Sequence, residues 1–291
     1  MSSLLSVDTA LALIPDFTAR KWCCQQLRGG LTNRNYKIEC NQHCFVLRLD
    51  DKHTKELGLN RAIELKARNM ASARRIAANV IFSDSDRGIL LSEYLPGKIW
   101  RAEDLTDQQN LESLAELLQQ VHSLPRLGTQ FDAGIVAQRY VDKLNNRPDL
   151  LVFGQKCRQL VANTVTQENI CCCHNDIIAG NIVAADNLKL LDWEYACDND
   201  PLFDLACVIA FQELDKKSAD ILLSAYAGGV DGALREHLEG QIRLFDAIQW
   251  LWFAARQCIS PDLRQNGYLE ALRRRIDSRI PGLAEVRIRL H

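Results

Sequence analysis

The spacing of apolar residues changes once along this chain, at the pair Pro96-Gly97. Upstream of that pair, apolar runs with a period near two are separated by turn-forming residues, which favours antiparallel strands. Downstream, apolar residues recur with a period near 3.6, which is typical of amphipathic helices. We therefore expect an α+β protein of two lobes, with a small antiparallel-sheet lobe in residues 1–96 and a larger, mainly helical lobe in residues 97–291.

Local patterns place elements within each lobe. Strand character is present at residues 22–49, interrupted by turns at Gly29-Gly30 and at residues 41–43, and again at residues 79–82 and 88–95. Thr106 and Gln109 have the spacing of a capping box before the clearest helix. The predicted helices are residues 60–73, 107–122, 221–226 and 234–257.

Composition limits the possible partners. The 291 residues are 47% hydrophobic and 25% charged, which is ordinary for a globular protein. The formal net charge of -2 provides no basic field for binding nucleic acid or an anionic membrane. There is no uncharged apolar run of about 18 residues and no basic stretch of a signal peptide at the start. We therefore expect a cytoplasmic protein with a small-molecule partner, while the oligomeric state stays open.

Eleven cysteines are unusual in number but not in pattern. The count is odd, and consecutive residues such as Cys171, Cys172 and Cys173 are too constrained to pair conveniently, so a disulfide framework is not expected. Neither this triplet nor Cys23-Cys24 has the Cys-x-x-Cys spacing with a matching pair that structural zinc requires. The pattern favours reduced, buried thiols.

One segment carries the residues that chemistry would need. Asp176 and Asn181 stand five residues apart on a glycine-containing loop after an apolar strand, and His174 opens that loop. Sixteen residues after Asp176, another apolar strand ends in Asp192. Phosphoryl transfer requires an acid that orients the attacking hydroxyl and oxygen ligands for Mg²⁺. We expect Asp176 to be that acid, Asn181 and Asp192 to hold Mg²⁺, and His174 to orient the loop.

The segment from His174 to Ala196 resembles the signature of the choline/ethanolamine kinase, thiamine kinase and aminoglycoside phosphotransferase superfamily. The sequences at residues 192–196 and 199–206 resemble bacterial choline kinases in particular. The resemblance implies a bilobal protein-kinase-like fold that uses ATP and Mg²⁺ to phosphorylate a small alcohol. It also implies that Asp204 lies on the following helix and holds the catalytic loop by hydrogen bonds, although an ordinary acid at a helix N-terminus remains the alternative.

The same resemblance assigns nucleotide contacts in the first lobe. The Gly-Gly turn would cover the phosphates, a basic strand residue would contact them while paired with a helix acid, and the end of the lobe would meet adenine through its main chain. A simple hairpin turn and a solvent-facing arginine are the alternatives for the first two features. The candidate nucleotide-binding residues are Gly30, Thr32, Asn33, Arg48, Glu64, Glu93 and Leu95.

The acceptor pocket departs from the choline kinase pattern. Gln249 stands where those enzymes tend to have the first residue of a Trp-x-x-Trp pair, and Phe211 stands where they have a glutamate. A cationic alcohol would still favour aromatic faces and an acid, so choline, thiamine, ethanolamine and aminoglycosides all remain possible acceptors. The alternative for the tryptophans is a place in the core. The candidate acceptor-binding residues are Glu194, Glu213, Trp250 and Trp252.

Two other classes of protein fit the sequence less well. A non-catalytic nucleotide-binding pseudokinase would be expected to lack one of Asp176, Asn181 and Asp192, and all three are present. A protein kinase would be expected to have an Ala-Pro-Glu motif and a long activation segment after Asp192, and neither is present before residue 199. The sequence therefore favours a small-molecule kinase.

Overall fold

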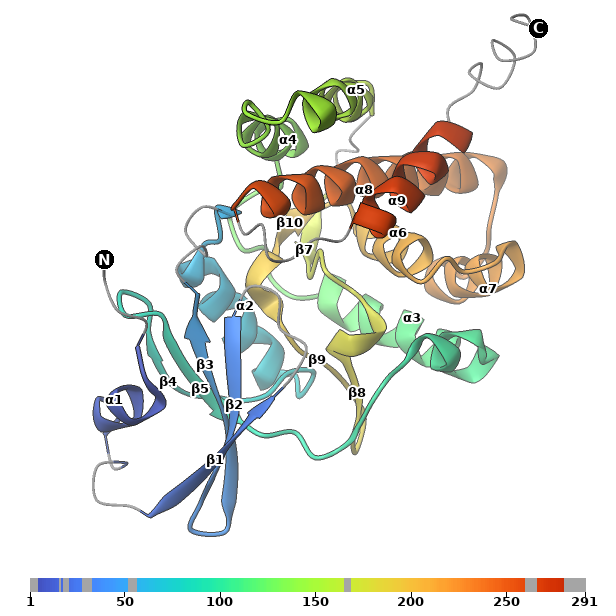
Figure 1. Ribbon diagram of the computed structural model, residues 1–291. Coiled ribbons are helices and arrows are strands. Elements are labelled where there is room, and N and C mark those ends of the chain that lie inside the picture. Colours follow the sequence, from blue (N-terminus) through green and yellow to red (C-terminus); the bar gives the residue numbers. More distant parts are fainter. Residues whose placement is uncertain are drawn as a thin grey trace, which may run out of the picture.

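A computed structural model describes residues 5–15, 17, 21–27, 33–51, 57–164, 169–259 and 266–279 of the chain (Figure 1). The first part of the chain forms an antiparallel sheet of five strands in the order β1-β2-β3-β5-β4. The strands expected from the period-two pattern are thus present, and the α+β fold class is confirmed. Their bounds are β1 Trp22–Leu27, β2 Asn33–Cys40, β3 His43–Asp50, β4 Val80–Asp84 and β5 Ile89–Glu93.

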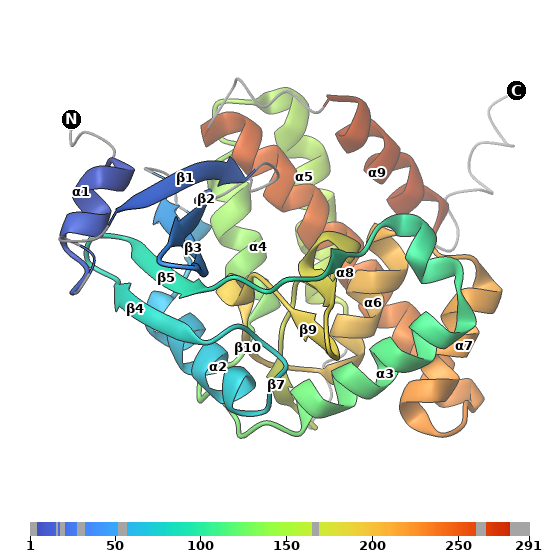
Figure 2. The same ribbon diagram turned by 90° about the horizontal axis from the view of Figure 1, so that it is seen from below.

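Two helices use opposite faces of this sheet. Leu47 and Leu49 of β3 belong to the same small core as Leu11 of helix α1, Val7–Ala12. Arg48, between those leucines, points to the other face, where it meets helix α2, Arg61–Ala73 (Figure 2). The alternation of side chains along β3 therefore buries two leucines on one side and delivers a guanidinium to the other.

The rest of the chain is mainly helical, with short strands where it meets the sheet (Figure 1). Helix α8 is buried along much of its length and packs against α4, α5, α6 and α9. The helices are α3 Gln108–His122, α4 Ala133–Asp142, α5 Pro148–Ala162, α6 Pro201–Phe211, α7 Lys216–Ala227, α8 Gly232–Ile259 and α9 Asn266–Ser278. The short strands are β6 Lys98–Ile99, β7 Cys171–Cys173, β8 Ile182–Ala184, β9 Leu188–Leu190 and β10 Cys197–Asn199, and the 3-10 turns are η2 Ala102–Thr106, η3 Ala179–Asn181 and η4 Trp193–Tyr195.

The start of α3 differs from the sequence prediction. Asp107 is the N-cap, and its side chain accepts the Asn110 N–H at 3.0 Å. The predicted capping box of Thr106 and Gln109 is wrong, because Thr106 ends the preceding 3-10 turn and its hydroxyl donates to the Glu103 carbonyl at 2.7 Å. None of the helices in the described part of the chain combines the length and apolar character of a membrane-spanning segment.

The two parts of the chain meet where the spacing of apolar residues changes. Gly97 lies against the β8 backbone, because a Cβ atom added there would stand 2.5 Å from the Ala184 carbonyl oxygen. A side chain would push β6 away from β8, so glycine permits this close approach. Helix α2 also contacts η4 and β10. The sheet and its helix are thereby held next to the loops that carry Asp176 and Asp192.

Candidate active site

Asp204 on α6 fixes the backbone of the loop that follows β7. Its fully buried carboxylate accepts the N–H groups of His174 at 2.9 Å and Asn175 at 2.6 Å. The same carboxylate accepts from His122 Nε2 at 3.1 Å. Charge-assisted bonds of this kind are short and strong, so the start of the loop is anchored to a core helix.

His174 connects the two loops of the site. Its Nε2–H donates to the Leu191 carbonyl at 2.8 Å, which leaves Nδ1 to accept the Asp176 N–H at 3.3 Å. Burial lowers the pKa of His174 to about 4, and its ring packs edge-on against Trp193 at 4.8 Å. The neutral His174 ring, held in one tautomer, therefore links the backbone of Asp176 to that of Leu191, the residue before Asp192. These contacts suit a residue that orients the loop.

Asp176, Asn181 and Asp192 all line one cavity. The Asn181 side-chain amide donates to the Asp176 carbonyl at 2.9 Å and to its carboxylate at 3.0 Å. Withdrawal from water, with the nearby charges of Asp192 and Glu194, raises the pKa of Asp176 to about 8. Burial and the charge of Glu194 also raise the pKa of Asp192. Crowded carboxylates with an amide beside them are oxygen donors of the kind that Mg²⁺ prefers, so these residues fit the ion that the sequence predicts.

The Arg48 side chain pairs with Glu64 beneath the sheet. Arg48 Nη1 meets Glu64 Oε1, and Nη2 meets Oε2 at 3.0 Å, so the pair is bidentate and buried. Arg68, one turn along α2, donates to Glu64 at 2.9 Å. Arg68 was not predicted as a site residue. Its contact with Glu64 could have been inferred from the sequence, because residues i and i+4 are neighbours on a helix.

Arg61 was not among the predicted site residues, and it joins the sheet to the second lobe. Its guanidinium donates to Asp50 at 2.8 and 3.0 Å, to Glu64 at 2.7 Å and to Glu194 at 3.2 Å. Asn33 of β2 donates to the same Glu194 oxygen at 2.7 Å. The Glu194 carboxylate is therefore directed toward the sheet, although the residue also lines the cavity.

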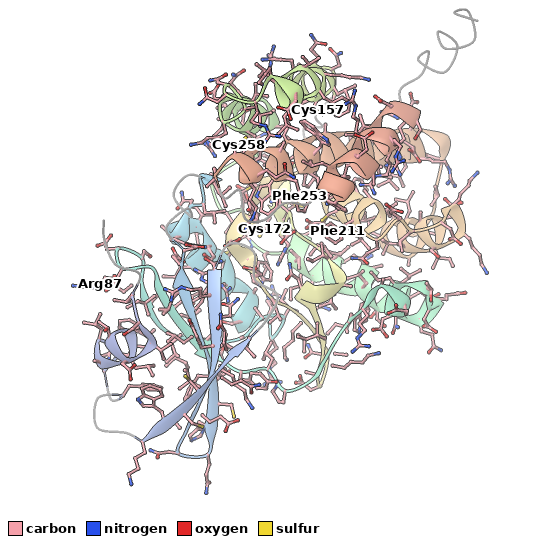
Figure 3. All side chains as sticks on the ribbon, in the orientation of Figure 1. Arg87, Cys157, Cys172, Phe211, Phe253 and Cys258 are labelled. Carbon is pink, nitrogen blue, oxygen red and sulfur yellow. The ribbon has the colours of Figure 1, made fainter. Side chains whose placement is uncertain are left out.

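The cavity has a volume of about 430 Å³ and opens beside Asp176. Its walls are formed by the start of α2, by helices α4, α6 and α8, and by residues 174–181, the segment called the catalytic loop. Figure 3 labels Phe211, the last residue of α6, and Phe253 in α8, which are among its aromatic lining residues. The aromatic residues of the lining are Phe131, Tyr140, Tyr195, Phe203, Phe211, Phe245, Trp252 and Phe253.

The predicted acceptor residues of α8 are not equivalent. Trp252 lines the cavity, and its indole N–H donates to the Tyr195 hydroxyl at 2.8 Å. Trp250 is only 2% exposed, donates to the Leu269 carbonyl and packs edge-on against Phe153. The expectation that Trp250 faces the acceptor is therefore wrong, because its direction along α8 places it in the core.

Glu213 also lies away from the cavity. Its φ of 51° follows the end of α6, and its carboxylate is exposed and bonded to Arg275 Nη1 at 3.1 Å. The backbone leaves the helix at this point and carries the side chain to the surface. The expectation that Glu213 contacts the acceptor is corrected by this geometry.

Two of the remaining nucleotide candidates lie at or just after the end of β5, and two lie outside the described residues. Gly30 and Thr32 belong to the second group. Glu93 ends β5 with an exposed side chain that accepts from Asn79 at 2.8 Å, and Leu95 follows in the segment that leads to the second lobe. Of the two candidates that the structure describes, neither Glu93 nor Leu95 lines the cavity.

Asn175 is a further residue that sequence reasoning missed. It adopts a φ of 64°, and its side chain accepts from Asn199 at 2.7 Å and donates to the Tyr195 carbonyl at 3.1 Å. Asparagine tolerates this left-handed conformation better than most residues. The side chain of Asn175 thus connects the catalytic loop to η4 and β10 by hydrogen bonds. Its position next to Asp176 was the one feature of the sequence that could have indicated this role.

Comparison with known proteins gives concordant results. Residues 24–237 match the phosphotransferase enzyme family. Protein LicA of Haemophilus influenzae is 30% identical over 212 residues, which cover 68% of this chain and 61% of LicA, so the chain spans less than two thirds of that relative. Thiamine kinase of Escherichia coli is 30% identical over 124 residues, 42% of this chain and 43% of that enzyme. The crystal structure of a choline/ethanolamine kinase family protein from Mesorhizobium loti has the same fold, with a TM-score of 0.76, 21% identity and 95% of each chain covered.

Proposed function

Because this chain belongs to the phosphotransferase enzyme family, we propose that it transfers a phosphoryl group from ATP, with Mg²⁺, to the hydroxyl of a small cationic alcohol such as choline. The observation that carries the proposal is the cavity itself, which combines aromatic walls with the acids Asp176, Asp192 and Glu194. Aromatic faces and carboxylates together attract a cation, and Asp176 in the lining is the proposed partner of the ligand's hydroxyl.

Asp176 is the proposed catalytic acid-base group. Its backbone is held by His174 and its carboxylate by the Asn181 amide, so its direction is fixed. A carboxylate whose pKa is raised toward about 8 is well suited to accept the hydroxyl proton near neutral pH. Positioning and charge neutralisation supply most of the catalysis of phosphoryl transfer, so the hydrogen bonds that hold Asp176 in one direction serve this reaction.

Asp192 and Asn181 are the proposed Mg²⁺ ligands. When bound, Mg²⁺ would neutralise charge on the phosphate oxygens and on these crowded carboxylates. Asp192 has a left-handed backbone, with a φ of 58°, two residues after the end of β9, and it lines the cavity. The position of each ligand therefore depends on the local backbone rather than on a distant element.

The sheet lobe, residues 1–96, is proposed to cover the nucleotide, and residues 97–291 to hold the acceptor. Arg48, fixed by Glu64, would contact phosphate oxygens, while Gly30, Thr32 and Asn33 would lie over them. The main chain at Glu93 and Leu95 would meet the adenine edge. A guanidinium that is already oriented by a carboxylate loses little further freedom when it meets a phosphate.

Trp252 is the proposed centre of the acceptor site. Its indole is fixed through Tyr195, and Phe253 packs edge-on against it at 4.7 Å. With Phe211 in the lining rather than an acid, recognition of the cation would depend mainly on aromatic faces. Each such contact contributes about 0.5–2 kcal/mol, so several rings could replace a single carboxylate.

Thiamine is the second candidate acceptor. It also combines a positive charge with a primary hydroxyl, and a cavity of about 430 Å³ is within the range of pockets for drug-sized ligands. Trp250 lies in the core, and the α8 wall of the cavity is formed by Phe245, Ile248, Gln249, Trp252 and Phe253. A larger ring system could use the space that a second tryptophan would otherwise fill.

The direct test is ATP consumption by the purified protein with choline, ethanolamine, thiamine or an aminoglycoside, followed by identification of the phosphorylated product. We expect choline to be used best, with Mg²⁺ required. Asp176→Asn should lower kcat by about 10²–10⁴-fold while nucleotide binding persists, because the acid orients the acceptor and not ATP. The matched control is Asp186→Asn, the same change at an exposed aspartate between β8 and β9, which should remain active. Turnover of Asp176→Asn near that of the unmodified protein would refute the proposed role.

A further inference from the structure

A second group of donor atoms lies behind the catalytic loop. Among the residues that the structure describes, His122, Cys171 and Cys173 bring one donor atom each within 4.8 Å of one another. The two cysteines are two residues apart on β7, so their side chains share a face, and their sulfur atoms are 3.7 Å apart. His122 is the last residue of α3, which packs beside β7.

The spacing of the sulfur atoms suits one metal ion. Two thiolates bound to tetrahedral Zn²⁺ at about 2.3 Å are separated by about 3.8 Å, as the tetrahedral angle requires. The observed 3.7 Å between the Cys171 and Cys173 sulfurs is close to that separation and well above a disulfide bond of about 2.05 Å. The two thiols therefore need little movement to become ligands of the same ion.

His122 is oriented as a metal ligand would be. Its Nε2 faces the Asp204 carboxylate at 3.1 Å, and its Nδ1 faces the Tyr226 hydroxyl at 2.7 Å. The carboxylate accepts a hydrogen bond and so keeps the proton on Nε2, which leaves the Nδ1 lone pair directed away from Asp204. Histidines that bind metal usually donate their other ring N–H to a carboxylate in this way.

We propose that His122, Cys171 and Cys173 form a binding site for a thiophilic divalent cation of the Zn²⁺ class. Binding replaces the two thiol protons, so that Zn²⁺ enters, two H⁺ leave, and the neutral imidazole keeps its Nε2–H. A water molecule completes the fourth position, and the Tyr226 hydroxyl gives up its hydrogen bond with Nδ1 to the ion. Two sulfur donors and one nitrogen select such a cation over Mg²⁺, which prefers oxygen.

The site is accessible and is connected to the catalytic loop. Cys171 is half-buried, so an ion can reach the site from solvent through this residue, whereas the His122 side chain is only 6% exposed and Cys173 is fully buried. Cys173 directly precedes His174, and Asp204 bonds both to His122 and to the loop backbone. The bound ion would therefore stiffen the same loop that carries Asp176. This proposal does not depend on the acceptor or on catalysis.

The test uses Co²⁺ as a spectroscopic probe and Zn²⁺ as competitor with the full-length, reduced protein. We expect one Co²⁺ per chain, a thiolate-to-cobalt charge-transfer band, tetrahedral ligand-field bands, and displacement by Zn²⁺. Cys171→Ser should weaken binding at least about tenfold and reduce the charge-transfer band. Cys172→Ala is the matched control, because its side chain leaves the opposite face of the same strand, and it should bind as the unmodified protein does.

Three results would overturn the proposal. The first is the absence of a thiolate-to-cobalt band in the unmodified protein, which needs no variant and so is independent of any folding defect. The second is equal Co²⁺ affinity in folded Cys171→Ser and unmodified protein. The third, measured on protein purified without a reducing agent, is a count of fewer than eleven thiols after denaturation, with the loss mapped to a Cys171–Cys173 disulfide.

Discussion

Trp250 and Trp252 are two residues apart in α8, yet their rings occupy different environments. Each residue of an α-helix is turned by about 100° from the last, so residues two apart point in nearly opposite directions. Gln249 and Trp252, three apart, share the cavity face, whereas Trp250 packs toward α5. The displacement of one residue from the Trp-x-x-Trp pattern was visible in the sequence, but which of the two rings faces the cavity depends on how α8 lies on its neighbours.

Trp252→Leu keeps an apolar side chain but removes the aromatic face from the cavity. We expect the acceptor KM to rise about two- to thirtyfold, with the ATP KM nearly unchanged, because one cation–π contact contributes about 0.5–2 kcal/mol. Steady-state kinetics with each substrate varied in turn measures both constants. Trp250→Phe is the control, and we expect it to lower thermal stability while leaving the acceptor KM unchanged. A rise in acceptor KM for Trp250→Phe alone would reverse the assignment of the two rings.

The residues that the sequence placed most reliably are close to each other along the chain. Asp176 and Asn181 share one short loop, so their meeting requires only local geometry. The association of His122 with Cys171 and Cys173 depends instead on the packing of α3 against β7, and no spacing rule in the sequence encodes it. Glu213 failed as a prediction for a similar reason, because the backbone turn after α6 decides the direction of its side chain.

At the scale of elements, helix α2 packs against the sheet and also connects it to η4 in the second lobe. Its first residue, Arg61, contacts Asp50 of β3 and Glu194 of η4, while Glu64 receives Arg48. The pairing of Arg48 with Glu64 could be anticipated from a strand followed by a helix. The bridge from Arg61 to Glu194 could not, because it joins residues 133 positions apart. The start of α2 thereby links the sheet to the loop that carries Asp192.

Arg61→Ala should destabilise the protein by about 3–5 kcal/mol, since it removes a charged partner from the half-buried Asp50 and from the buried Glu194 at the same time. Arg61→Lys should recover only part of this loss, because an ammonium group cannot reproduce the forked contacts of the guanidinium. Denaturant unfolding at neutral pH measures the free energy of unfolding for each variant.

The control is Arg87→Ala. Arg87 lies at the edge of the molecule, pairs with Asp84 and has a side chain that is 60% exposed (Figure 3). Solvent and salt screen an exposed ion pair of this kind, so this variant should unfold almost as the unmodified protein does. Equal losses for Arg61→Ala and Arg87→Ala would show that the bridge adds nothing to stability.

Elements differ in how well a sequence can specify them. Apolar residues recur with a period near two in the strands of the five-stranded sheet and near 3.6 in helices such as α3. Both kinds of element were therefore predicted from the sequence. Strands β7 and β10 have three residues each, too few for a period, and they form because they pair with each other. Helices α4, α5 and α9 were missed for a related reason, since much of the stability of a helix comes from packing and not from its own sequence.

At the scale of the whole molecule, the second lobe supplies the acids beside the catalytic loop, and the first lobe holds one of them in place. Asp176 and Asp192 come from the second lobe, and the neighbouring Glu194 is held by Asn33 and Arg61 of the first. The raised pKa of Asp176 is the thermodynamic sign of this crowding, because the folded protein resists ionisation of that group. The crowded carboxylates favour binding of Mg²⁺ and of a cationic ligand, but they lower the stability of the protein when these cations are absent. Such a conflict between function and stability is common at functional sites.

This conflict predicts a pH-dependent difference between the unmodified protein and Asp176→Asn. The pKa of Asp176 is about 8 in the folded state, above its value of about 4 in the unfolded state. Below both pKa values Asp176 is protonated in the folded and the unfolded state, so its ionisation does not change the free energy of unfolding. As pH rises from about 4 to about 8, the unfolded state ionises first, so the free energy of unfolding falls by at most about 1.4 kcal/mol per pH unit. Asparagine does not ionise, so the variant escapes this loss.

Asp176→Asn should therefore become more stable than the unmodified protein as pH rises through this range, although it is expected to be inactive. Denaturant unfolding of both proteins at several pH values gives the difference directly, and the lowered pKa of His174 cancels because both proteins contain it. Saturating Mg²⁺ should reduce the difference, since a cation beside Asp192 relieves the repulsion between the carboxylates. A difference that stays constant between about pH 4 and pH 8 would mean that Asp176 ionises as freely in the folded protein as in the unfolded chain.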